Sequence, residues 1–443
     1  MQDWLTRGAL SQGRAIEQGA LCPMALTEAY LDAIRAHPQA ERIYASVTEK
    51  RALLEAMTAR SRARSGLRRG PLDGVPISWK DLFDSAGTVT AAGSALLAGR
   101  IPLRDAQVVR VARQAGAICL GKTHMSEFAY SGLGLNPVTA TPPCVNDADA
   151  VPGGSSSGAA ASVAFGLAAL GVGTDTGGSV RIPAAWNDLV GLKTTHGRLP
   201  LDGVVPLARR FDTVGPLARN VEDCAAFLAA LEGRVLPDLR GASLTGRRFL
   251  VLEGAPFEDI RPEPAQAFED AAQRLERAGA TLTRATLPVV DEVLALSAII
   301  YTPEAWAEWR DLIDTRPDVM FPPILARFRA GAEHSAADYI AAWNRLAELR
   351  ARYIAQVAGY DAVILPTAPN LPPNAARLLA DEAYYTTENL LTLRNTRIGN
   401  MLGLCALTLP TGTPSAGISF MAGPMEEDRL LRLGAAAEPV LRS

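Results

Sequence analysis

Two Gly-rich stretches hold serines of a type and spacing that acyl-transfer chemistry can use. In TDTGGSVRIPAAW, Ser179 follows Gly177 and Gly178 directly. Two glycines allow positive φ values and a close approach of the backbone to a ligand. A serine beside exposed backbone N–H groups combines a nucleophile with donors for an oxyanion. The simpler interpretation is a Gly-rich turn with a solvated serine, and these residues alone do not decide between the two.

A second stretch and one lysine supply candidates for activating such a serine. VPGGSSSGAAASVAFG places Ser155 directly after Gly153 and Gly154, and Lys80 directly follows the strand-like VPISW. Burial disfavours the ammonium form of lysine, and a neutral lysine can act as a general base. The alternatives are a loop that caps the following Ala-rich helix and a surface lysine whose charged end stays in water.

Histidine and cysteine do not predict a metal site or a His-based triad. The histidines share no ligand spacing, the cysteines form no CxxC pair, and no GxSxG stretch occurs. We therefore expect no metal and no cofactor. Five scattered cysteines also indicate neither a disulfide framework nor a zinc site, so a reducing cytoplasm is the expected location.

GAICLGKT, residues 116–123, matches the P-loop pattern GxxxxGK[ST]. A phosphate-binding loop needs the four middle residues to be the loop itself, after a strand. Here these residues are apolar and read as the strand, with a helix before them. We therefore expect no nucleotide site and a structural role for Lys122.

The pattern along the chain alternates helix and strand. Apolar spacing predicts helices over 24–36, over 105–115 with Asp105 as N-cap and Gly116 after its end, and over 264–278. Buried strands are predicted in AICL, RRFLVLEG, YDAVILPT and AGISFMAG. GAAASVAFGLAALGVG predicts a buried helix followed by a strand. The alternation favours an α/β fold with a large, at least partly parallel sheet.

Composition excludes several classes of partner. The 443 residues carry a net charge of −3 without a basic run, which argues against nucleic acid. The N-terminus lacks a signal-peptide pattern, and the longest central uncharged run is shorter than the roughly 20 residues of a membrane span. We expect a small-molecule substrate, no nucleic acid and no membrane span; a homodimer is compatible with the sequence.

Four blocks of the chain resemble the amidase signature family, in the family's order. They are GVPISWKD, then GKTHMSEFAYSG, then PGGSSSGAAASVAFG through TDTGGSVRIPAAW to GLKTTHGR, and last YDAVILPT with the later GISFMAG. The resemblance covers nearly the whole chain. It implies one domain over 1–443, with the signature block at about 71–220, and a large twisted mixed sheet covered on both faces by helices.

The resemblance also implies the roles of the candidate residues. Lys80, Ser155 and Ser179 would form a Ser–cis-Ser–Lys triad in which Ser179 is the nucleophile and the peptide bond of Ser155 is cis. The oxyanion would be bound by backbone N–H groups of residues Thr176, Gly177, Gly178 and Ser179. Substrate contacts are expected from Tyr130, Gly154 and Arg181. For Arg181 the alternative is a structural ion pair below the site.

The function implied is hydrolysis of the C–N bond of a small or medium amide, with carbamates and aryl amides included. One alternative is the glutaminase subunit of a tRNA-dependent amidotransferase, and another is a catalytically silent binding protein. The segment 290–345 is least like the family, and its aromatic residues suit a pocket wall or lid. The alternative is ordinary helix packing. These aromatic residues are Tyr301, Trp306, Trp309, Phe321, Phe328 and Trp343.

Overall fold

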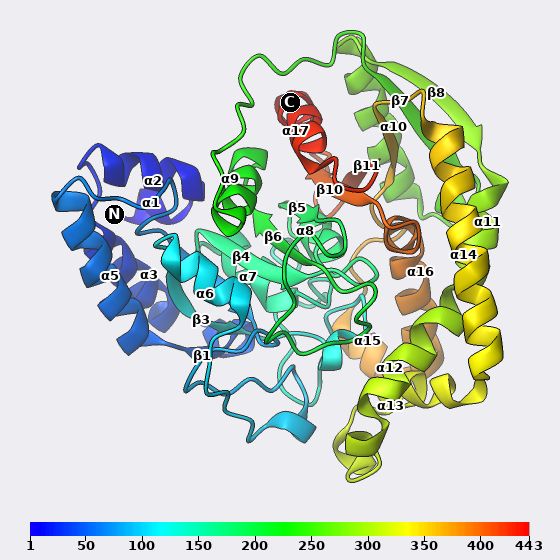
Figure 1. Cartoon of the computed structure of the whole chain (residues 1–443), viewed down its shortest axis with the longest axis horizontal. Helices are drawn as coiled ribbons and strands as arrows, with labels where there is room; N and C mark the ends of the chain where they lie inside the picture. Colours follow the sequence, from blue (N-terminus) through cyan, green and yellow to red (C-terminus); the bar gives the residue numbers. More distant parts are fainter. Residues whose placement is uncertain (443) are drawn as a thin grey trace.

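One eleven-stranded mixed sheet runs through the whole molecule (Figure 1). The structure is a computed structural model and describes residues 1–442. The strands, in chain order, are β1 (Tyr44–Val47), β2 (Pro76–Lys80), β3 (Ile118–Thr123), β4 (Leu170–Thr174), β5 (Val190–Lys193), β6 (Val214–Ala218), β7 (Arg248–Glu253), β8 (Thr281–Thr286), β9 (Ala362–Pro366), β10 (Cys405–Pro410) and β11 (Gly417–Ala422). Their spatial order is β1-β3-β2-β4-β6-β5-β10-β11-β9-β7-β8.

Parallel pairing is confined to the two sides of the sheet. Strand β2 pairs in parallel with β3 and β4, and β7 pairs in parallel with β8 and β9. The strands between these groups pair antiparallel. The predicted partly parallel sheet is therefore confirmed. Parallel neighbours end at the same edge of a sheet, so β2 and β4 bring their carboxyl ends together.

Helices account for most of the remaining chain. The α-helices are α1 (Gln2–Leu5), α2 (Ala9–Glu17), α3 (Pro23–Ala36), α4 (Ala40–Ile43), α5 (Glu49–Arg64), α6 (Gln107–Gln114), α7 (Ser157–Ala164), α8 (Arg181–Trp186), α9 (Val221–Glu232), α10 (Pro262–Arg277), α11 (Pro288–Ala295), α12 (Ser297–Ile313), α13 (Pro322–Arg329), α14 (Ala336–Val357), α15 (Ala375–Ala380), α16 (Glu382–Met401) and α17 (Glu427–Leu441). None of the helices in residues 1–442 combines the length and apolar character that crossing a bilayer requires.

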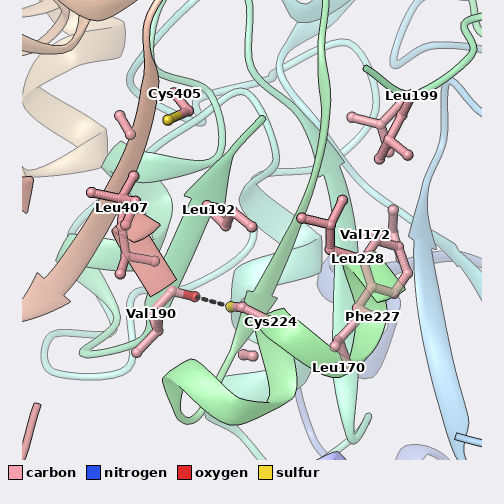
Figure 2. Close-up of a cluster of buried hydrophobic side chains, with 14 of the residues drawn as sticks. Leu170, Val172, Val190, Leu192, Leu199, Cys224, Phe227, Leu228, Cys405 and Leu407 are labelled. Carbon is pink, nitrogen blue, oxygen red and sulfur yellow. Dashed lines mark hydrogen bonds between the residues drawn. The ribbon is translucent and has the colours of Figure 1, made fainter. Parts of the chain in front are cut away.

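Helices cover both faces of the central strands. On one face, Val190 and Leu192 of β5 pack against α9, where the Cys224 thiol points to the Val190 carbonyl (Figure 2). On the other face, Leu217 of β6 packs against the Ala-rich helices α7 and α8. Successive side chains of a strand point to opposite faces of the sheet, so a central strand can pack against helices on both faces. The predicted α/β class is confirmed.

The predicted elements largely match the observed ones. Helix 24–36 is α3, helix 264–278 is α10, and the uncharged central run divides into α7 and β4. Strands β3, β7, β9 and β11 lie where buried strands were predicted.

The helix predicted over 105–115 is α6, but its predicted cap is wrong. The N-cap of α6 is Ala106. The Asp105 carboxylate instead pairs with Arg51 and accepts a hydrogen bond from the Ala86 N–H. An ion pair with α5 has replaced the local capping bond, while Gly116 takes the expected positive φ of 94°.

The apparent P-loop is a strand, as predicted. Three of its four middle residues lie in β3, and Lys122 is a buried strand residue whose ammonium group lies 3.1 Å from a carboxylate oxygen of Asp81. The segment has no loop that could surround a phosphate.

Candidate active site

Lys80 is the last residue of β2 and lies at the edge where β2 and β4 end together. Its ammonium nitrogen lies 2.7 Å from Ser155 Oγ and 2.9 Å from Thr174 Oγ1. The side chain is fully buried. Burial lowers the pKa of Lys80 to about 7, although the Asp212 and Asp175 carboxylates act in the opposite direction. Lys80 is thus an amine that can be neutral at ordinary pH.

Ser155 directly follows Gly154, whose backbone packs closely against the backbone of Gly134. The peptide bond between Gly154 and Ser155 is cis. A Cβ atom at Gly154 would lie 2.5 Å from the Gly134 backbone nitrogen, so this position has no room for a side chain. Ser155 is fully buried and precedes α7 by two residues. Its backbone and its hydrogen bond with Lys80 fix where the hydroxyl lies.

Ser179 lies near the end of the loop that joins β4 to α8, two residues before the helix begins. Its backbone carbonyl accepts a hydrogen bond from the Ser156 N–H at 3.1 Å, which ties this loop to the segment that carries Ser155. Ser179 lines a cavity, whereas Lys80 and Ser155 do not. The three residues therefore run from the protein interior to the cavity wall.

The backbone around Ser179 leaves three of the four predicted oxyanion donors free. No described atom accepts a hydrogen bond from the N–H groups of Thr176, Gly177 or Ser179. The Gly178 N–H is different, because it donates to a carboxylate oxygen of Asp175 at 2.9 Å. The expectation of a free donor at Gly178 is therefore corrected: Asp175 has taken that N–H.

Two distant hydroxyls fix the orientation of this loop. Tyr301 Oη donates to the Thr176 carbonyl at 2.8 Å, and Thr396 Oγ1 donates to the Gly177 carbonyl at 2.7 Å. In a trans peptide the carbonyl and the N–H point in opposite directions. The bond from Tyr301 thus turns the N–H of Gly177 away from Tyr301 and leaves it free.

A buried ion pair lies beneath the loop. Arg181 donates through Nε and Nη2 to the two carboxylate oxygens of Asp175, each at 3.0 Å, and both residues are fully buried. Asn400 also donates to Asp175 at 2.8 Å. Because Arg181 does not line the cavity, the structure shows the structural pairing that was its alternative interpretation.

The cavity at Ser179 has a volume of about 280 Å³. Of the predicted substrate contacts, Tyr130 lines it, whereas Gly154 and Arg181 do not. The 290–345 segment supplies part of its wall through residues of α12 and α13. The lining residues are Ala129, Tyr130, Ser131, Thr176, Gly177, Ser179, Leu207, Ser297, Ala298, Tyr301, Thr302, Pro323, Arg327, Ala330, Tyr385, Thr386, Asn389, Leu390, Leu393 and Arg397.

Most aromatic residues of the 290–345 segment pack against other rings. Tyr301 alone among the six named above lines the cavity. Phe328 lies edge-on to Tyr130 with ring centroids 4.8 Å apart, and Trp343 stacks on Phe211 at 5.2 Å. The expected pocket wall is thus built by this segment, while ordinary packing accounts for the other aromatic residues.

Several residues of the site escaped sequence reasoning. Thr174 and Asp175 stand just before the paired glycines, so their position beside the motif was an available signal. Asp212, Tyr301 and Thr396 carried no local signal. Asp212 accepts a hydrogen bond from Thr176 Oγ1 at 2.6 Å, and burial raises the pKa of its carboxyl group.

Within residues 1–442, no three His, Cys, Asp or Glu side chains lie close enough together to hold a metal ion. All five cysteines are free thiols.

Comparison with known proteins places this site in a family. The family sequence model described as Amidase matches residues 25–431. The chain is 38% identical to the 2-amino-5-chloromuconic acid deaminase of Comamonas testosteroni in an alignment 386 residues long that covers 84% of this chain and 82% of that protein. It is 32% identical to a glutamyl-tRNA(Gln) amidotransferase subunit from Acidothermus cellulolyticus, over 100% of this chain and 96% of that protein.

A solved structure shows the same fold. The native peptide amidase of Stenotrophomonas maltophilia superposes with a TM-score of 0.84 at 29% identity, over 100% of this chain and 98% of that chain. The fold and the family match define a hydrolase of C–N bonds. The chain belongs to the amidase family.

Proposed function

We propose that the protein hydrolyses a small amide through an acyl-enzyme on Ser179, with Lys80 and Ser155 as the proton relay. The observation that carries this proposal is the buried Lys80 amine, with its lowered pKa, 2.7 Å from Ser155 Oγ. A buried base beside one serine, with a second serine at the cavity wall, supports nucleophilic catalysis without histidine.

In the first half-reaction the neutral amine of Lys80 accepts the proton of Ser155, and Ser155 accepts the proton of Ser179. Ser179 Oγ then adds to the amide carbonyl. The carbonyl oxygen becomes an oxyanion that the free N–H groups of Gly177, Ser179 and Thr176 stabilise. Donors preorganised for this developing charge contribute about 3–4 kcal/mol each in serine hydrolases.

The relay then runs in reverse. The C–N bond breaks as Ser155 returns a proton to the leaving nitrogen and regains one from Lys80, which releases the amine or ammonia. Water attacks the acyl-enzyme after giving its proton to the same relay, and the products are a carboxylic acid and free Ser179. Each proton taken in one step is given back in the next, so Lys80 ends neutral.

The cavity supports a small substrate. Its volume of about 280 Å³ lies just below the range of about 300–1,000 Å³ that is usual for small-molecule pockets. The relative from Comamonas testosteroni is named for a small acid, 2-amino-5-chloromuconic acid, which agrees with that size. Carbamates and aryl amides of similar size remain within this proposal.

The test is a panel of small amides, carbamates and esters assayed for amine release with the wild type and Ser179→Ala. We expect Ser179→Ala to lose about 10⁴- to 10⁶-fold in kcat. Ser162→Ala is the matched control, because Ser162 is a buried serine of α7 that bonds to Ser78 and the Ala159 carbonyl. Retention of activity in Ser179→Ala would contradict the proposal.

A second candidate function is the glutaminase subunit of a tRNA-dependent amidotransferase. It is favoured by several relatives named as a subunit of glutamyl-tRNA(Gln) amidotransferase, including two matched over 100% of this chain. Glutaminase activity that depends on a co-purifying second protein would favour this candidate. Turnover of simple amides by the isolated chain, without hydrolysis of glutamine, would exclude it.

Location and assembly form a further part of the proposal. Five free cysteines support a reducing compartment, and we place the protein in the cytoplasm on that basis. We propose a homodimer, which light scattering on the purified chain would test directly. A monomer mass at working concentration would contradict the dimer without affecting the proposed chemistry.

A further inference from the structure

The wall of the cavity at Ser179 carries two arginines, Arg327 on α13 and Arg397 on α16. Within residues 1–442, no Asp or Glu side chain lies within 4.0 Å of either guanidinium group. No Asp or Glu is among the lining residues of the cavity. Two cations therefore face a cavity whose lining residues supply no counter-charge.

Arg397 is the more unusual of the two. No described atom accepts a hydrogen bond from its guanidinium group. Burial, and then the nearby Arg327, lower the pKa of Arg397 to about 10, so it stays charged at neutral pH. Arg397 also borders a second cavity lined by Glu258, Asp259 and Asp291, but none of these comes within ion-pair distance.

Tyr130 orients the guanidinium group of Arg327 through two contacts. Its Nη1 donates to the Tyr130 carbonyl at 2.6 Å, and its guanidinium carbon lies 4.3 Å from the centre of the Tyr130 ring. An arginine has five N–H donors in a planar fork. These contacts orient the fork and leave other donors for a ligand.

Uncharged donors lie in the same cavity. The Tyr130 hydroxyl and Ser297 Oγ are buried and have no hydrogen-bond partner among the described residues. A buried polar group without a partner is costly unless a ligand or water satisfies it. Together with the two arginines, these hydroxyls make a set of donors that an anionic acceptor with several lone pairs would satisfy.

We infer that the substrate carries a carboxylate, which Arg327 and Arg397 bind while the scissile amide lies at Ser179. The substrate class is then the monoamide of a dicarboxylic acid or a similarly built acid amide. The inference rests on the proposed function, because it assigns the rest of the substrate whose amide meets Ser179. A carboxylate would neutralise charge that the protein itself leaves unpaired, and Arg–carboxylate pairs combine charge with a fixed planar geometry.

The test compares kcat/KM for acid amides with that for neutral amides of the same chain length. The pairs are succinamate with butyramide, glutaramate with pentanamide, and adipamate with hexanamide. We expect the wild type to prefer the acid by at least about 100-fold at its best chain length. Arg397→Met and Arg327→Met should each reduce that preference by about 10- to 100-fold, mainly through KM.

Arg394→Met is the matched control. Arg394 lies one turn earlier on α16 and does not line the cavity at Ser179. Burial lowers the pKa of Arg394, whereas Glu258 and Asp259 support its charge. This variant should keep the preference for the acid amide. A loss of preference equal to that of Arg397→Met would overturn the assignment to Arg397.

A second measurement does not depend on turnover of the variants. Glutarate and adipate should slow the labelling of wild-type Ser179 by a fluorophosphonate, whereas pentanamide at the same concentration should not. A labelled, active enzyme that prefers neutral amides and gains no protection from dicarboxylates would overturn the carboxylate inference alone. Failure of Ser179 to react with the fluorophosphonate would instead contradict the proposed function.

Discussion

Two lysines on neighbouring strands of the sheet are equally buried and meet different partners. Lys122 of β3 forms an ion pair with Asp81, whereas Lys80 of β2 meets only the hydroxyls of Ser155 and Thr174. Both side chains are fully buried. Burial lowers the pKa of both lysines, but the Asp81 carboxylate in contact with Lys122 acts in the opposite direction, whereas the groups in contact with Lys80 are uncharged hydroxyls. The partner, rather than the depth of burial, separates the structural lysine from the proposed base.

Arg181 and Arg397, both near the site, differ in the same way: one is paired with a carboxylate and the other is not. Arg181 is bound on both carboxylate oxygens of Asp175 and supports the loop of Ser179. Arg397 has no such partner and faces the cavity. Buried cations that are paired within the chain maintain the fold, and those left unpaired at a cavity wall are available to a reaction or a ligand.

Among replacements of the buried cations, the largest effect on turnover should follow from replacing the unpaired lysine, Lys80. Lys80→Met should reduce amide turnover by about 10³- to 10⁵-fold, because the relay loses its base. In the wild type, kcat/KM should rise as pH rises through about 7, since the amine must lose its proton to act and its pKa is lowered to about 7. The pH–rate profile of both proteins checks this.

In Lys80→Met the rising limb near pH 7 should be absent from the residual rate. Near-normal amide turnover with an unchanged profile would show that another group is the base.

Replacement of the paired lysine, Lys122, should instead lower the free energy of unfolding. Lys122→Met leaves the buried Asp81 carboxylate without its cation, and such a loss costs about 3–5 kcal/mol in the free energy of unfolding. Urea unfolding measures it, and the double variant Lys122→Met with Asp81→Leu should recover part of the loss. A stability equal to that of the wild type would show that the ion pair contributes nothing.

The smallest effect on the free energy of unfolding is expected from replacing Arg397. Arg397→Met leaves no carboxylate unpaired, so the free energy of unfolding should change by less than about 1 kcal/mol or increase slightly. Urea unfolding beside Lys122→Met gives the comparison directly. A loss comparable with that of Lys122→Met would mean that Arg397 supports the fold, and the contrast between paired and unpaired cations would fail there.

The sequence predicted those site residues that can be recognised from residue type and spacing within a short stretch of the chain. Ser179 and its glycines are adjacent in the chain, and Lys80 ends a short apolar run, so residue type and spacing were enough to nominate them. The hydroxyls that orient the loop lie far away in sequence: Tyr301 is 125 residues from Thr176, and Thr396 is 219 residues from Gly177. No periodicity or motif connects residues at such separations.

The same limit applies to the fold. Helix and strand periods predicted the elements, because these depend on near neighbours. The order of the eleven strands could not be derived, since it places β10 and β11 between β5 and β9. Asp105 shows how a distant partner overrides a local rule, because Arg51 of α5 binds the carboxylate that would have capped α6.

The central claim is that Ser179 is the nucleophile that forms the acyl-enzyme and that Lys80 activates it. The most direct measurement is intact mass spectrometry with peptide mapping after reaction with a fluorophosphonate, on the wild type, Lys80→Met and Lys122→Met. We predict one adduct per chain on the peptide that holds Ser179, formed at a similar rate in Lys122→Met and far more slowly in Lys80→Met. An adduct on Ser155, or equal labelling rates in Lys80→Met and the wild type, would contradict the account.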